Sequence, residues 1–143
     1  MAEINYKRNQ AEDALWAVFA SRHGDAKVVP SAFVTRVKRL LEIDRAEPVS
    51  RGSAYAFSER PAGGKGSDSV FTEFNCVCLA IGLDMLDIGF KQREIVLFLR
   101  MHRQIIEEEI GFMLMLGQGH PTERKNRATP NHATMIHTIR AFI

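Results

Sequence analysis

The fold of this chain is decided by residues 54–98, which read AYAFSERPAGGKGSDSVFTEFNCVCLAIGLDMLDIGFKQREIVLF. Tyr55 and Phe57 alternate with alanines, which is the period-2 pattern of a short, half-buried strand. The segment 61–69 is rich in Gly, Pro and Ser and cannot hold regular structure, so Val70 and Phe71 can return as a second strand. We therefore predict a small β-hairpin, followed at once by helices.

Two helices are predicted after this hairpin. Thr72 is placed to cap the first of them, with Glu73 in its first turn, and Gly89 ends it by the usual C-terminal glycine device. The helix is apolar over much of its surface, so we expect it at the centre of the core. A second helix should then run from Lys91 to about Leu116, which is long for a chain of 143 residues.

Two further helices are predicted before the hairpin. In the first, from about Arg8 to Ser21, apolar residues recur at helical spacing; they are Ala11, Leu15, Val18 and Phe19. The second starts at Pro30 and continues to about Asp44, with Phe33, Val37, Leu40 and Leu41 on its apolar face. The expected fold is therefore mainly α with a small β-hairpin, a winged-helix-like helical domain with a long C-terminal helix and a tail.

Charge is distributed unevenly although the net charge is only +2. Residues 31–66 hold seven Lys and Arg against four acids, whereas residues 67–90 hold four acids and no base. A basic helix beside a basic hairpin is the electrostatic footprint expected for contact with nucleic acid phosphates. The predicted hairpin would be the wing of a winged-helix-like domain. The residues predicted to bind duplex DNA are Arg36, Lys38 and Arg39 on the second helix and Arg51, Arg60 and Lys65 in or beside this wing. On charge alone, a merely solvated surface is the alternative interpretation.

Two motifs in this region resemble the second half of MerR-type winged-helix regulators. They are the strand Tyr55-Ala56-Phe57-Ser58-Glu59 and the corner Leu86-Asp87-Ile88-Gly89-Phe90-Lys91-Gln92-Arg93-Glu94-Ile95. The resemblance covers about 45 residues and implies a DNA-binding transcriptional regulator with a wing and a dimerisation helix. The connection between the first two helices, residues 22–30, departs from the pattern because it is longer than a helix-turn-helix connection.

The long C-terminal helix carries an apolar stripe that favours self-association. Its members are predicted to form a homodimer interface, and they are Leu99, His102, Ile106, Ile110 and Met113. A stripe that extends past a compact domain usually finds a partner helix. Two alternatives remain open: the stripe belongs to the core of its own chain, or the chain is a helical protein-interaction module that binds a partner protein through this helix.

No catalytic or metal-binding constellation is found in the sequence. The five histidines lack the spacing of a zinc site, and no nucleophile motif is present. Cys76 and Cys78 lie two positions apart, which points them to different faces of a helix, so buried free thiols are expected. We predict that the chain is not an enzyme and that it needs no cofactor or metal.

The predicted organisation is a DNA-binding unit over residues 1–98, the rest of the long helix over 99–116 and a polar, basic tail over 117–143. The tail could be disordered, docked on a partner or a further phosphate-contacting arm. No secretory signal is evident at the N-terminus, and no apolar run is long enough for a membrane span. We therefore expect a cytoplasmic, nucleoid-associated protein that does not bind a membrane.

Overall fold

The computed structural model describes residues 5–23, 27–49, 54–59 and 70–117, and the side chains of 21–23 and 113–117 lie outside this description. The order of elements is β1 (Tyr6–Lys7), α1 (Arg8–His23), α2 (Ser31–Ala46), β2 (Val70–Phe71), α3 (Glu73–Asp87) and α4 (Gln92–Gly117). The expectation of a mainly helical fold is confirmed; the chain also has a two-stranded antiparallel sheet, although not the predicted hairpin. The four helices also agree closely with those predicted.

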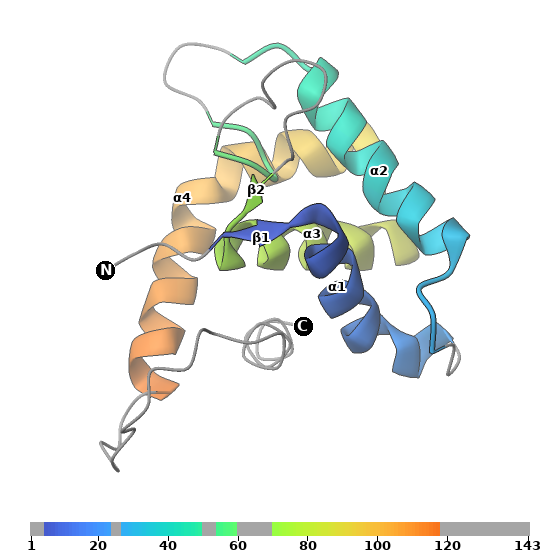
Figure 1. Ribbon diagram of the computed structural model, residues 1–143. Coiled ribbons are helices and arrows are strands. Elements are labelled where there is room, and N and C mark those ends of the chain that lie inside the picture. Colours follow the sequence, from blue (N-terminus) through green and yellow to red (C-terminus); the bar gives the residue numbers. More distant parts are fainter. Residues whose placement is uncertain (1–4, 24–26, 50–53, 60–69, 118–143) are drawn as a thin grey trace.

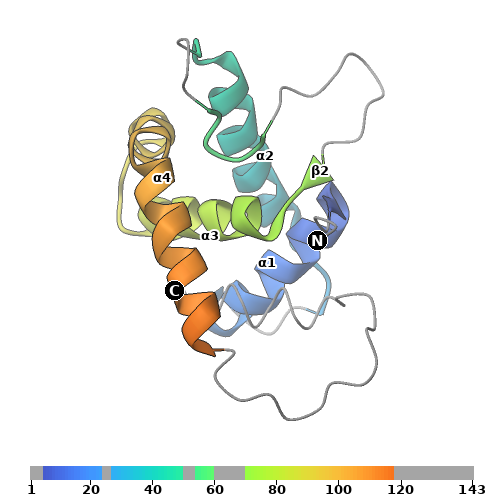
Figure 2. The same ribbon diagram turned by 90° about the vertical axis from the view of Figure 1, so that its left-hand side faces the viewer.

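Helix α3 runs through the middle of the fold, between α1 and α2, and α4 crosses it (Figure 1, Figure 2). An uninterrupted run of six residues in α3, Asn75–Ala80, is buried, which explains why this helix is apolar over most of its circumference. Helix α4 packs against both α2 and α3. The prediction of a central helix is confirmed.

Local signals explain where α3 begins and ends. The Thr72 hydroxyl accepts a hydrogen bond from the Asn75 backbone N–H at 3.1 Å, as an N-cap should. At the other end Gly89 adopts φ 101°, and the Phe90 N–H donates to the Met85 carbonyl at 3.0 Å. This is a Schellman motif, in which a left-handed residue lets the chain satisfy the last carbonyls of the helix.

The amphipathic faces of α1 and α2 are buried as predicted. The members of the α1 face, Ala11, Leu15, Val18 and Phe19, are all in the core, as are Phe33, Val37 and Leu40 of α2, whereas Leu41 is partly buried against it. Trp16 also belongs to the core and packs edge-on against Phe33, with ring centroids 5.1 Å apart.

The predicted pairing of the two wing strands is wrong. Strand β2 pairs antiparallel with β1 at the start of the chain, with Tyr6 opposite Phe71 and Lys7 opposite Val70. The segment around Tyr55 and Phe57 forms a bend rather than a strand. The consecutive residues Ala56 and Phe57 are both buried. In a strand, consecutive side chains would point to opposite faces, so the alternation seen in the sequence does not separate a buried from an exposed face here.

Candidate functional site

The bend at residues 54–59 is fixed by a buried carboxylate on α2. Both oxygens of Asp44 accept backbone hydrogen bonds, from the N–H of Ala56 at 3.0 Å and from that of Phe57 at 3.1 Å. These N–H groups are consequently not available to a β-ladder, which is the physical reason that the expected hairpin does not form.

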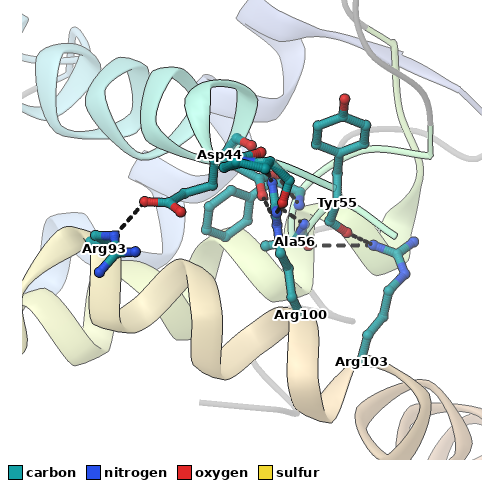
Figure 3. Close-up of polar contacts among 9 residues, drawn as sticks. Asp44, Tyr55, Ala56, Arg93, Arg100 and Arg103 are labelled. Atoms are coloured by element: carbon teal, nitrogen blue, oxygen red, sulfur yellow. Dashed lines mark hydrogen bonds and ion pairs between the residues drawn. The ribbon is translucent and has the colours of Figure 1, made fainter. Parts of the chain in front are cut away.

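Helix α4 supplies the countercharge to this carboxylate. The Arg100 Nε donates to the Asp44 carboxylate at 2.8 Å, and the same guanidinium binds the backbone carbonyls of Asp44, Glu47 and Pro48 at the end of α2 (Figure 3). A cation at this position also interacts favourably with the negative end of the α2 dipole. Arg100 therefore joins α4 to the C-terminus of α2.

Arg103, about one turn after Arg100, joins α4 to the bend at residues 54–59. Its guanidinium donates to the Tyr55 carbonyl at 2.6 Å (Figure 3). It also pairs with Glu59 and lies over the Phe74 ring at 4.7 Å. Asp44 and Arg100 contact each other directly, and Arg103 is linked to them through the backbone of residues 55–57; we call these three residues the Asp44 network. Every member that we describe has several partners within the chain, so the network acts as a structural clamp.

The two thiols are suited to packing rather than to nucleophilic chemistry. Burial raises the pKa of Cys76 to about 12, with a further contribution from the nearby Glu73 carboxylate. Burial likewise raises the pKa of Cys78 to about 12, although Arg103 opposes the shift. A thiol in this state is protonated near neutral pH and unreactive. The expectation of free, buried cysteines is confirmed.

Three of the six residues predicted to contact DNA lie within the described residues, and all three are on α2. Arg36 pairs with Asp87 and donates to the Leu83 carbonyl at 3.4 Å, so it bridges α2 and α3. Lys38 pairs with Glu42 at 3.7 Å on the solvent side of α2, and Arg39 is exposed. The remaining three, Arg51, Arg60 and Lys65, lie outside the described residues.

The stripe predicted to form a dimer interface is largely covered by the chain itself. Leu99 and Ile110 are buried in the core, and Ile106 is partly buried against it. His102 is intermediate, stacks on Phe98 with ring centroids 4.3 Å apart and contacts the Phe98 carbonyl. The side chain of Met113 lies outside the described residues. This stripe mainly attaches α4 to its own chain.

A different face of α4 is exposed and apolar, and we call it the outer α4 face. Met101 is 78% exposed, Ile105 58% and Phe112 60%. The face is completed by two further exposed side chains, Leu97 and Phe98. Large apolar side chains that gather on one exposed side of a helix are typical of a surface that receives a partner. Sequence reasoning missed it because it identified an apolar stripe without determining which side the core would cover.

Other kinds of site receive no support from the described part of the chain. There, no group of three or more His, Cys, Asp and Glu side chains is arranged to hold a metal ion. Among the same residues, no helix combines the length and the apolar character needed to cross a membrane.

No protein family, curated protein or solved structure matches this chain. The likeness to MerR-type regulators consequently depends only on the short motifs around Tyr55 and Gly89, of which the first does not form the expected strand.

Proposed function

We propose that this chain is a helical protein-interaction module that receives a partner helix on the outer α4 face. The observation that carries the proposal is the exposure of large apolar side chains, Met101 above all, along one side of a helix that the rest of the chain holds in place. Exposed apolar area on a helix is stabilised when a second amphipathic helix covers it.

The attachment of α4 supports this role. Leu99 packs into the core on the opposite side from Met101, while Arg100 and Arg103 join the helix to α2 and to the bend at residues 54–59. The helix is therefore ordered before any partner arrives. A preorganised surface loses less conformational entropy on binding than one that must fold at the same time.

The proposal is tested by placing a photoreactive amino acid at Met101 of the full chain and irradiating living cells. A matched control carries it at Thr35, an exposed position on α2. We expect a discrete adduct from position 101 and none from position 35, and the adduct should disappear when Leu97→Asp is added. Absence of any adduct at 101, or an equal yield at both positions, contradicts the proposal.

Duplex DNA binding is a second candidate, favoured by the exposed basic residues of α2. Lys38, Arg39 and Arg45 are all exposed on this helix, and cations of this kind bind backbone phosphates. The test is fluorescence anisotropy with duplex DNA, using the variant Arg39→Glu with Arg45→Glu. Binding that weakens steeply with salt and is lost in the variant supports this candidate. Binding that the variant leaves unchanged excludes α2 as the contact.

A further inference from the structure

We propose that the partner received by the outer α4 face is a second copy of this chain, docked antiparallel and centred on Met101. The inference rests on the proposed function, because it names the occupant of the same surface. The two-fold axis then lies beside Met101. This residue is not part of the stripe from Leu99 to Met113 that the sequence pattern predicts as a dimer interface.

The apolar side chains at the centre of this face are symmetric about Met101. Leu97 precedes Met101 by four residues and Ile105 follows it by four, so the three form one ridge along the helix. All three are exposed. In an antiparallel pair centred on Met101, Leu97 of one copy meets Ile105 of the second. A two-fold interface requires this self-complementarity, since each copy presents the same patch.

The charges at the two ends of α4 favour an antiparallel arrangement. Lys91 and Arg93 are exposed at the beginning of the helix, and three consecutive acids, Glu107–Glu109, are exposed toward its end. Arg93 donates to Glu47, yet its side chain remains 69% exposed. An antiparallel partner brings its acids beside these bases, whereas a parallel partner would bring acids beside acids.

Two further acids lie on the same side of the helix as Met101 and oppose this arrangement in part. Glu94 and Glu108 are exposed and lie seven residues on either side of Met101. In the antiparallel pair, Glu94 of one copy therefore lies near Glu108 of the second, and this repulsion opposes the attraction of Lys91 and Arg93 for the partner's acids. The apolar contact of the Leu97, Met101 and Ile105 ridge and the opposite charges at its two ends outweigh this contact between acids.

The register is tested by crosslinking between single-cysteine additions to the full chain. Leu97→Cys and Ile105→Cys chains with different tags are mixed and treated with a short bismaleimide. In the antiparallel pair, position 97 of one copy faces position 105 of the second. Position 97 of one copy and position 97 of the second are about 12 Å apart along the helix axis, and the same holds for position 105. We expect mixed adducts well above the yield of Leu97–Leu97 or Ile105–Ile105 adducts. A preference for identical positions overturns the antiparallel register. Cys76 and Cys78 are buried, so the unaltered chain serves as the background control.

Self-association itself is tested by sedimentation equilibrium. The full chain should approach twice its mass of 16.1 kDa, and Met101→Asp should return it to the monomer. Val28→Asp is the matched control, because Val28 is equally exposed at 79% but lies far from this ridge in the sequence. A monomer at all concentrations, or a dimer that survives Met101→Asp, overturns the inference. If the chain is a monomer but still gives a photo-adduct from position 101 with another protein, the proposed function stands and the homodimer is excluded. Absence of any adduct from position 101 overturns both the proposed function and the homodimer.

Discussion

The Asp44 carboxylate and the Arg100 guanidinium form an ion pair at 2.8 Å in which the two side chains are only 3% and 7% exposed. This pair lies between the end of α2 and the middle of α4, and the same carboxylate holds the backbone of Ala56 and Phe57. Three segments that are distant in the sequence therefore depend on one acidic side chain.

Asp44→Asn should be strongly destabilising. The substitution keeps the size of the side chain but leaves the Arg100 charge buried without its counterion, and it turns one acceptor into a donor that faces a backbone N–H. Breaking a buried pair from one side costs about 3–5 kcal/mol. Urea denaturation should show this loss. The control is Glu42→Gln, which removes an exposed pair with Lys38 and should cost less than about 1 kcal/mol. Equal effects of the two substitutions would contradict the assigned role of Asp44.

Stability should fall in alkaline solution because of three buried groups. The pKa of each thiol, Cys76 and Cys78, is raised by burial from 9.0 to about 12, and that of Tyr6 is raised from 10.0 to about 12, again chiefly by burial. The folded state therefore keeps protons that the unfolded state releases. The contribution of these three groups to the free energy of unfolding is complete below about pH 9 and is lost as the pH rises toward 12.

The free energy of unfolding, measured by urea titration between pH 7 and 11, should decline above pH 9. A variant with Cys76→Ala and Cys78→Ala should show a shallower decline, although its stability at pH 7 is lower because methyl-sized replacements leave space in the core. An equally steep decline in this variant would exclude the thiols as its cause.

Two glycines in helices should respond oppositely to alanine. A Cβ added at Gly82 would lie 3.3 Å from Phe57 Cζ and 3.4 Å from Ile95 Cγ2, so α3 approaches its neighbours closely there. A Cβ added at Gly111 meets nothing within 4 Å. Gly111→Ala should gain up to about 1 kcal/mol of helix propensity. Gly82→Ala should lower the melting temperature, because overpacking costs about 1–3 kcal/mol. A rise in both melting temperatures would show that the core around Gly82 can relax.

The cap of α3 provides a smaller test. Thr72→Ala removes the acceptor of the Asn75 N–H and should cost about 1 kcal/mol in thermal or urea denaturation. Thr72→Ser retains the hydroxyl and should restore most of the loss. Thr35→Ala, at an exposed position inside α2, is the matched control and should change stability little. A Ser variant as unstable as the Ala variant would assign the effect to the lost methyl group.

The helices could be predicted because their signals are local. Apolar residues at helical spacing, the Thr72 cap and the Gly89 terminator each act within a turn or two of the backbone they control. Such signals are present in the sequence whatever the rest of the chain does.

Strand pairing could not be predicted in the same way. Tyr55 and Phe57 alternate as they would in a strand, but the partner of their backbone is the side chain of Asp44. One signal was available: an acid near the end of a helix is unfavourable beside the helix dipole unless another group compensates it. That signal indicates that Asp44 has a partner without identifying Arg100.

The exposed face of α4 was missed for a different reason. The helix carries apolar residues on more than one side, so several stripes fit a helical period. The stripe containing Leu99 and Ile110 fits as well as the ridge of Leu97, Met101 and Ile105, and only the tertiary packing determines that the first is buried.

The pairing of β1 with β2 has a consequence for the order in which the chain assembles during its synthesis. Tyr6 leaves the ribosome early but cannot meet Phe71 until the intervening residues have followed. The contact between Asp44 and Arg100 forms later still, because Arg100 lies on the last described helix. The first half of the chain therefore holds its apolar faces uncovered until the second half arrives, and long-range closure of this kind slows folding. A nascent chain stalled before α4 should accordingly be sensitive to proteases and dependent on chaperones.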